Sequence, residues 1–246
     1  MYHRLVLNSD EDSVNIIHLS KEKFEEQLIY LKEKKFETIT FTDLKDLSLS
    51  ERKKRKYIIL TFDDGYEDNY TILYPLLKKY NMKAVIYLVS NINYNKWDMD
   101  ELGEKKLNLL NKEQILEMSN SGLIEFGGHT SNHVKLDTLS VGEQFNEIKE
   151  NKIFLEKLLN KKLISFAYPY GRFTNESKKL VKDCGYKYGV ATNKGDFFID
   201  VDSYEVRRIG IFSDITLSKF KRRVSGKYNM KYRRKKWKNL YTYMKS

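Results

Sequence analysis

The chain has 246 residues, of which 41% are hydrophobic, and can therefore bury one sizeable core. Its single cysteine, Cys184, excludes an internal disulfide framework, and the absence of a linker or solenoid repeat favours one domain. The first residues lack a signal-peptide pattern, and no segment has the roughly 20 apolar residues that span a bilayer. We therefore expect a cytoplasmic protein.

The excess of positive charge is confined to one end of the chain. Residues 219–246 hold 12 of the 45 Lys and Arg residues and none of the 34 Asp and Glu residues, so the rest is nearly neutral. Such a tail, with aromatic residues between its cations, can bind an anionic membrane surface, bind another polyanion, or form a solvated helix. We predict a folded body over residues 1–213 and a basic, aromatic-rich, helical tail over 214–246.

Strand and helix patterns alternate along the body. Runs rich in β-branched and aromatic residues predict strands at 3–8, 36–41, 57–62, 83–89, 123–129, 163–171 and 204–211. Helices are expected after Ser20, over 67–81, after Asn111, after Ser140 and over 175–183, with a loop at 89–110. This alternation predicts a parallel sheet, open or closed into a barrel, with its active site at the carboxyl ends of the strands.

Two adjacent acids, Asp63 and Asp64, follow the apolar run 57–62 and precede a glycine. A single acid here would suit an ordinary strand-to-helix loop, where a carboxylate favours the helix dipole. Two adjacent carboxylates in a buried turn repel each other, and a cation between them and water offsets that cost. The pair is therefore a candidate site at the end of a strand.

Two of the four histidines, His129 and His133, lie four residues apart after another predicted strand. On a helical turn or in a tight loop, that spacing aims both imidazoles at one point. Taken alone, this spacing is explained as well by chance or by a structural role as by a metal site. Together with the strand-end acids, it predicts a centre for zinc or a similar divalent ion, which imidazole and carboxylate ligands suit.

Three short segments resemble a known family. "TFDDGY" at 61–66, "HTSNH" at 129–133 and "FAYPYG" at 166–171 match, in order and rough spacing, the first three motifs of the polysaccharide deacetylases, the NodB-homology group or carbohydrate esterase family 4. The resemblance covers about residues 1–213 and implies an α/β fold, a distorted (β/α) barrel, with a metal-dependent N-deacetylase site. The opening "YHR" and the segment 19–44 further resemble the branch that acts on poly-N-acetylglucosamine.

The resemblance implies a role for each matching residue. Asp64, His129 and His133 would bind the metal, zinc before cobalt, nickel or manganese, and Asp63 would be the general base for a metal-bound water that attacks the amide. The Tyr170 amide would join the metal in binding the oxyanion. The rings of Tyr168 and Tyr170 would wall the sugar or simply pack, and the Thr130 hydroxyl would fix its loop. The motif residues implied at the substrate are Thr130, Tyr168, Pro169, Tyr170 and Gly171.

Two departures from the family pattern leave roles open. Many members carry an arginine at the start of the third motif to hold the catalytic aspartate, whereas this chain has Phe166 there. We expect Arg208, or failing that Arg207, to reach Asp63, although an exposed pair of arginines is an equal alternative. A late histidine that protonates the leaving amine is also missing. His3 is the candidate general acid, because "YH" on the first strand resembles a branch in which this histidine is N-terminal.

The implied substrate is an N-acetylated amino sugar, foremost N-acetylglucosamine, in a surface polysaccharide or a lipid-linked glycan. The basic tail would then hold the protein peripherally at the inner membrane face. The alternative is a non-catalytic glycan-binding module on the same barrel, against which the intact acids and histidines argue. Nucleic-acid binding depends on the tail alone and is the least favoured function.

Overall fold

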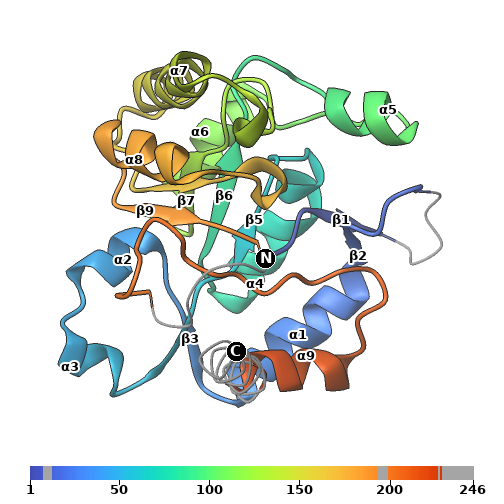
Figure 1. Cartoon of the computed structure of the whole chain (residues 1–246). Coiled ribbons are helices and arrows are strands. Elements are labelled where there is room, and N and C mark those ends of the chain that lie inside the picture. The colour runs from blue at the N-terminus through green and yellow to red at the C-terminus, as the bar shows by residue number, and fades with distance from the viewer. Residues whose placement is uncertain (8–12, 193–198, 227, 229–246) are drawn as a thin grey trace, which may run out of the picture.

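A five-stranded parallel sheet forms the centre of the protein, in the order β5-β6-β7-β8-β9. The computed structural model describes residues 1–7, 13–192, 199–226 and 228. Figure 1 shows helices α6, α7 and α8 on one side of the molecule and α1 and α9 together on another. The strands of the central sheet are β5 (Thr61–Phe62), β6 (Ala84–Leu88), β7 (Ile124–Gly128), β8 (Ser165–Ala167) and β9 (Tyr188–Val190).

Irregular segments extend the sheet from both edges until they meet. Tyr2 forms a parallel bridge to Phe62 on β5, and Val206 forms one to Val190 on β9. The amide of Ile211 then donates to the Met1 carbonyl at 2.8 Å. The predicted α/β fold with a distorted barrel is therefore confirmed, because the sheet closes through single bridges rather than through complete strands.

Two small parallel sheets flank the barrel and correct one prediction. They pair β1 (Arg4–Val6) with β2 (His18–Ser20) and β3 (Phe36–Thr38) with β4 (Lys56–Ile58). The run 57–62, predicted as one strand, is wrong as a single element, because it is divided between β4 and β5. The chain changes neighbours in the middle of this run: the Ile39 amide donates to Ile58, whereas the Val85 amide on β6 donates to Leu60.

The predicted late strand at 204–211 is also wrong, and β9 was not predicted. Residues 204–211 make one bridge rather than a ladder, because they bond to different neighbours in turn. The Val206 and Arg208 amides donate to Gly189 and Thr192, whereas the Ile211 amide donates to Met1. Apolar patterning identified an extended segment here but could not show that it joins two edges of the barrel.

Side-chain caps begin most of the helices as predicted. Ser20 caps α1, Asn111 and Gln114 form a capping box on α6, and Ser140 and Glu143 form one on α7. The helix predicted over 67–81 is a π-helical turn, η1 (Asn69–Leu73), followed by α4 (Tyr74–Tyr80). The remaining helices are α1 (Lys21–Glu33), α2 (Phe41–Asp46), α3 (Leu49–Arg52), α5 (Lys96–Leu102), α6 (Lys112–Asn120), α7 (Val141–Leu159), α8 (Asn175–Asp183) and α9 (Leu217–Val224), with 3-10 turns η2 (Leu136–Thr138) and η3 (Pro169–Gly171).

The expected loop at 89–110 contains helix α5, which is a further correction. This helix has only seven residues and ends at Gly103 in the left-handed region. So short a segment has no repeated apolar face that sequence periodicity can detect. Its buried Trp97 packs in a small apolar cluster with Tyr66, Val89 and Leu109.

The first part of the predicted tail is packed against the body. Ile215 and Phe220 are 1% exposed and belong to the main core. Helix α9 lies along α1 (Figure 1), and the Phe220 ring meets Tyr30 edge-on at 6.2 Å. The tail residues 227 and 229–246 lie outside the described residues. Within the described part of the chain, none of the helices has the length and apolar character needed to cross a bilayer.

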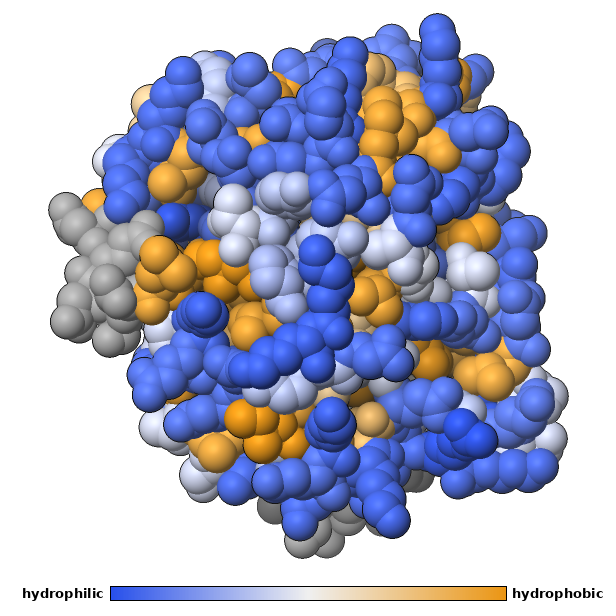
Figure 2. Space-filling model, turned by 180° about the vertical axis from the view of Figure 1, so that it is seen from behind, coloured by the Kyte–Doolittle hydropathy of each residue, from blue (hydrophilic) through white to orange (hydrophobic). Residues whose placement is uncertain are grey.

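The outer surface carries mostly polar side chains. Figure 2 shows the rear face, where apolar residues form separate patches with hydrophilic residues between them. The apolar residues concentrate instead in a main cluster, with a second cluster around Tyr87, Val85 and Val190. These clusters fix the strands whose ends carry the site.

A glycine on β7 permits close packing against β6 and β8. A methyl group added at Gly127 would meet the Tyr87 ring and lie 2.7 Å from the Ser165 carbonyl oxygen. We expect Gly127→Ala to lower the free energy of unfolding by about 1–3 kcal/mol, as overpacking does. Gly142→Ala on α7 is the matched control, because no described atom lies within 4 Å of its added methyl. That change should raise stability by about 0.5–1 kcal/mol. Equal urea midpoints for the two variants would contradict this account.

Candidate active site

The candidate residues lie at the carboxyl ends of neighbouring strands. Asp63 and Asp64 directly follow β5, and His129 directly follows β7. Tyr168 and the turn η3 follow β8. Parallel strands share one carboxyl edge, so the sheet brings together segments that are distant in the sequence.

Asp64, His129 and His133 converge on one point. The Nε2 atom of His129 lies 3.3 Å from Asp64 Oδ1, and that of His133 lies 3.2 Å from the same oxygen. All three ligand atoms lie within 4.8 Å of one another, and all three residues are buried. One carboxylate and two imidazoles that face a common space match the donor set of three-ligand zinc sites.

The hydrogen bond at the far side of His129 shows why a cation fits this space. Its Nδ1 lies 2.7 Å from the Ala167 carbonyl, which can only accept, so Nδ1 carries a proton. In the neutral imidazole, Nε2 then presents its lone pair to the Asp64 carboxylate. Two acceptors that face each other repel unless a cation lies between them. Asp64 supplies the negative charge, and its Oδ1 is buried with no hydrogen-bond partner among the described residues, so a cation in this space would satisfy it.

Asp63 has a different partner. The Arg208 guanidinium grips both carboxylate oxygens, with Nη1 at 2.5 Å from Oδ1 and Nη2 at 2.7 Å from Oδ2. The Arg208 Nε donates to the Ala191 carbonyl at 2.9 Å, which fixes the plane of the fork. Burial alone would raise the pKa of Asp63, but Arg208 outweighs it and lowers the pKa. Asp63 is therefore ionised at neutral pH and is paired with Arg208 rather than with the two histidines.

His3 lies beside the same carboxylates through the bridge at the barrel edge. The Asp63 amide donates to the Tyr2 carbonyl at 3.0 Å, which brings the next residue, His3, level with the acids. Asn69 of the π-helical turn donates to the His3 carbonyl at 3.0 Å. Burial lowers the pKa of His3, and the Asp64 and Asp63 carboxylates act in the opposite direction. His18 lies elsewhere, with Nδ1 on the Asn15 carbonyl.

The backbone is strained at the site. Four of the seven described non-glycine residues with positive φ belong to the site motifs, namely Asp64, Thr130, His133 and Tyr170, and the other three follow helix ends. Left-handed backbone is costly for such residues and persists where the surrounding structure imposes it. The strain therefore marks the same positions that the motifs selected.

The third-motif residues do not all face the site. Tyr168 is fully buried, donates its hydroxyl to the Tyr204 carbonyl at 2.8 Å and stacks on Phe173, so the prediction that its ring walls a sugar is wrong. Pro169 and Gly171 are buried in the turn η3, and Thr192 occupies the space beside Gly171. Tyr170 is 38% exposed, and its ring centroid lies 4.7 Å from that of His133.

Thr130 is also inaccessible to a substrate. It is fully buried, and its hydroxyl accepts from the Val134 amide at 3.3 Å. The hydroxyl thus fixes the loop, as the sequence suggested, and the residue's place at the substrate is a correction that burial requires. Arg207 lies with Arg223 near the ring of Tyr228, away from the carboxylate that Arg208 holds.

Helix α7 supplies supporting residues that the sequence analysis missed. Asn151 is fully buried and accepts from the His129 amide while donating to the Thr130 and Leu88 carbonyls. Glu147 accepts from the Ser131 and Asn132 amides, both at 2.9 Å. A polar residue at the core-facing position between Ile148 and Leu155 was the available signal for Asn151.

Helix α5 supplies a second group that was missed. Its Trp97 stacks on His133, and its Asp98 accepts from the Tyr66 hydroxyl at 2.5 Å. The 89–110 segment contained no recognised motif, so only the folded structure shows that it reaches the histidine loop, residues 129–133.

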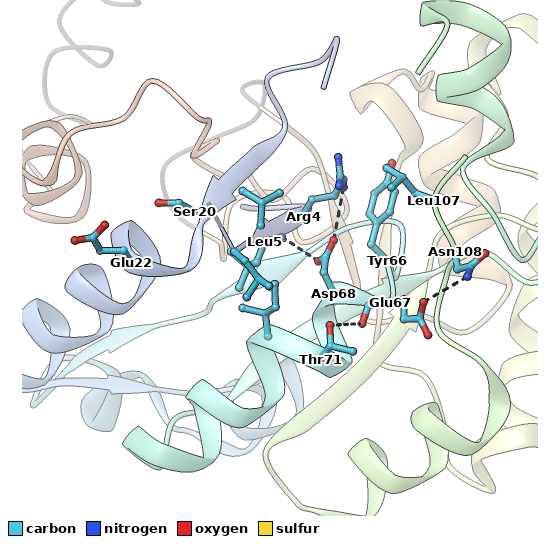
Figure 3. A pocket seen from close by; sticks show the side chains of 13 residues that line it. Arg4, Leu5, Ser20, Glu22, Tyr66, Glu67, Asp68, Thr71, Leu107 and Asn108 are labelled. Atoms are coloured by element: carbon cyan, nitrogen blue, oxygen red, sulfur yellow. Dashed lines mark hydrogen bonds and ion pairs between the residues drawn. The ribbon is translucent and has the colours of Figure 1, made fainter. Parts of the chain in front are cut away.

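A cavity of about 740 Å³ lies behind Tyr66 (Figure 3). Arg4 lies over the Tyr66 ring at 5.5 Å and 3.6 Å from Asp68, and the Leu5 amide donates to Asp68 at 2.9 Å. Tyr66 also packs against Trp97, which stacks on His133, but neither the three candidate metal ligands nor Asp63 lines the cavity. Its lining residues are Arg4, Leu5, Val6, Leu7, Ser20, Glu22, Tyr66, Glu67, Asp68, Thr71, Ile72, Leu107 and Asn108.

The buried pair of Arg208 and Asp63 predicts a pH-dependent loss of stability. Because the pKa of Asp63 is lowered in the folded state, the pair stabilises the fold above the unfolded-state pKa and loses its effect as pH falls. Arg208→Met leaves the carboxylate unpaired, and burial then raises the pKa of Asp63 in the variant. We therefore expect a loss of about 3–5 kcal/mol at pH 7.5 and a smaller loss at pH 5, where the unpaired carboxyl takes up a proton in the folded variant. Urea unfolding with chelator present measures both values. The exposed Arg172, which is paired with Asp137, is the control: Arg172→Met should cost under about 1 kcal/mol. Equal losses for the two variants would contradict the assignment.

Comparison with known proteins places the chain in a family. The family model "Polysaccharide deacetylase" matches residues 50–189. YxkH of Bacillus subtilis, a protein named as a polysaccharide deacetylase, is 31% identical over 89% of this chain and 73% of its own length. The poly-beta-1,6-N-acetyl-D-glucosamine N-deacetylase of Staphylococcus epidermidis is 26% identical over 87% of this chain and 78% of its own. The deacetylase PplD of Streptococcus pyogenes, solved in complex with acetate, has a TM-score of 0.75 and 30% identity, covering 88% of this chain and 92% of PplD. The chain therefore belongs to the polysaccharide deacetylase family and is a hydrolase of carbohydrate esterase family 4.

Proposed function

We propose that the protein removes the acetyl group from an N-acetylated amino sugar, foremost N-acetylglucosamine, in a surface polysaccharide or a lipid-linked glycan. The observation that carries the proposal is that two adjacent carboxylates have different partners. Asp63 pairs with Arg208, whereas Asp64 faces the imidazoles of His129 and His133. The acetate bound to PplD and the substrate in the name of the Staphylococcus epidermidis relative support this choice.

The three convergent residues fit a divalent metal, with zinc the first choice and cobalt, nickel or manganese as alternatives. Asp64, His129 and His133 would hold it. When bound, such an ion polarises an amide carbonyl and lowers the pKa of water to about 7 at zinc sites. Burial lowers the pKa of His133, so its imidazole is neutral near pH 7, as a metal ligand must be.

Asp63 and His3 would move the protons. Asp63 is ionised and oriented by Arg208, so it can accept a proton from the attacking water. A general acid must then protonate the departing amine, and His3 is the described histidine that lies beside both acids without belonging to the metal-ligand cluster. Because burial lowers the pKa of His3, it must gain its proton during turnover before it can donate one.

The turn η3 would bind the reacting amide and its sugar. The Gly171 and Arg172 amides are used inside the turn, on the Tyr168 and Pro169 carbonyls. We assign the preceding amide, that of Tyr170, to the oxyanion. The exposed Tyr170 ring would wall the sugar.

Acetate release from N-acetylglucosamine oligomers tests the activity. We expect release that chelator abolishes and added zinc restores, and that Asp63→Asn lowers by at least about 100-fold while zinc binding is retained. His3→Ala should likewise retain zinc and lose turnover. The competing function is a non-catalytic glycan-binding module on the same barrel. Glycan binding without zinc-dependent acetate release, at equal levels in wild type and Asp63→Asn, would support that module instead.

We further propose that the basic tail binds an anionic membrane surface, which would bring the enzyme to a lipid-linked glycan. The support is charge in the sequence: residues 219–246 hold 12 cations and no acid, and four of these cations lie on helix α9. Truncation at Phe212 cannot test this proposal, because it would remove the core residues Ile215 and Phe220.

Charge substitution in the full chain gives a sharper test of the tail. Replacing the four consecutive cations 233–236 by Gln should weaken binding to vesicles with anionic lipid by more than tenfold, since each cation contributes about 1 kcal/mol. The matched control replaces the exposed body residues Lys34, Lys35, Lys53 and Lys54 by Gln. Co-sedimentation measures both. Similar vesicle binding by the two variants would remove the support for a membrane role.

A further inference from the structure

His133 lacks the hydrogen bond that orients the other metal-ligand histidine. His129 donates Nδ1 to the Ala167 carbonyl at 2.7 Å, as ligating histidines ordinarily do to a carbonyl or carboxylate. Within the described part of the chain, Nδ1 of His133 is buried and has no hydrogen-bond partner. His133 also has a left-handed backbone with φ of 54°. Something other than a hydrogen bond must fix the plane of this imidazole.

Two aromatic rings contact the His133 imidazole. The Trp97 ring centroid lies 4.0 Å from that of His133, with 29° between the planes, which is a stacked arrangement. The Tyr170 centroid lies 4.7 Å away at a tilt of 56°. Stacking at this distance restricts rotation of the imidazole about χ2, because rotation would drive its edge into the indole.

Trp97 is itself held firmly. It is 7% exposed and packs edge-on against Tyr66 at 6.5 Å. The Tyr66 hydroxyl donates to Asp98, the next residue on α5, at 2.5 Å. Asn95, which is fully buried, donates to the Lys105 carbonyl and accepts from the Leu107 amide, so the two ends of the segment are tied together.

Helix α5 also reaches the second ring. Glu101 accepts from the Lys135 ammonium at 2.6 Å and from the Tyr170 hydroxyl at 3.4 Å. Lys135 in turn lies over the Tyr170 ring at 4.7 Å. One short helix therefore carries one aromatic neighbour of His133, Trp97, and contacts the other, Tyr170.

We propose that Trp97 is a positioning residue for His133, and that its stacking takes the place of the hydrogen bond that orients His129. The inference rests on the proposed metal site. Trp97 acts through His133 and touches no reacting atom, so its loss weakens metal binding rather than the recognition of the sugar.

Zinc affinity of the full-length protein, measured by competition with a chromophoric chelator, tests this role. Trp97→Leu keeps an apolar side chain but removes the stacked ring, and we expect zinc to bind about 10–100-fold more weakly, the usual cost of losing a supporting contact of a ligand. Trp97→Phe restores a ring and should bind zinc within about threefold of wild type. At saturating zinc, Trp97→Leu should keep the wild-type KM for the oligomer.

Leu109→Ala is the matched control, because Leu109 belongs to the same apolar cluster as Trp97 but makes no ring contact with His133. Histidine side-chain NMR supplies a second readout: in Trp97→Leu, the zinc-dependent shift of His133 should occur at higher zinc concentration than that of wild type. Unchanged zinc affinity in Trp97→Leu, or equal weakening in Leu109→Ala, would overturn the proposal. Zinc binding by wild type without acetate release would overturn the deacetylase activity alone, whereas no zinc binding by wild type would overturn both.

Discussion

Asp63 and Asp64 are adjacent carboxylates, each only 3% exposed, and the rest of the site compensates for burying them together. Each ion loses several kcal/mol of hydration on burial, which only well-placed opposite charge and hydrogen bonds recover. In the structure, the two side chains contact different partners. Arg208 neutralises Asp63, and the imidazole pair faces Asp64. In the proposed function, this division of charge would also divide the chemistry, with Asp63 as the base and Asp64 in the metal-ligand set.

This requirement couples the site to closure of the barrel. Arg208 lies on the segment that joins β9 to the N-terminal edge through the Val206 bridge and the hydrogen bond from Ile211 to Met1. His3 arrives by the same edge, because Tyr2 bridges Phe62 directly before the two acids. Arg208 and His3 are therefore both brought to the site by irregular segments that pair where the barrel closes.

The histidine loop depends on helices rather than on the sheet. Asn151 and Glu147 of α7 satisfy the loop's amides and carbonyls, and this holds Thr130 and His133 in left-handed backbone that would otherwise be unfavourable. Helix α5 contributes from the opposite side through Trp97. The two imidazoles thus meet at Asp64 by different means, one fixed by a carbonyl and the other by aromatic packing. Hydrogen bonds and packing thus hold the site residues in place, which is what positioning of a reactive group requires.

The sequence by itself determined the strand-end acids, the histidine pair, most helix starts and the parallel fold, because these follow from local spacing, capping and apolar runs. It also indicated Arg208 and His3 as candidates for vacant roles. It placed Tyr168 and Thr130 at a substrate, and it missed β9, α5, Trp97 and Asn151. Burial, edge pairing and contact between distant helices decide those features. Only the tertiary structure decided them, since each depends on which surfaces meet after the barrel closes, and no local pattern encodes that meeting.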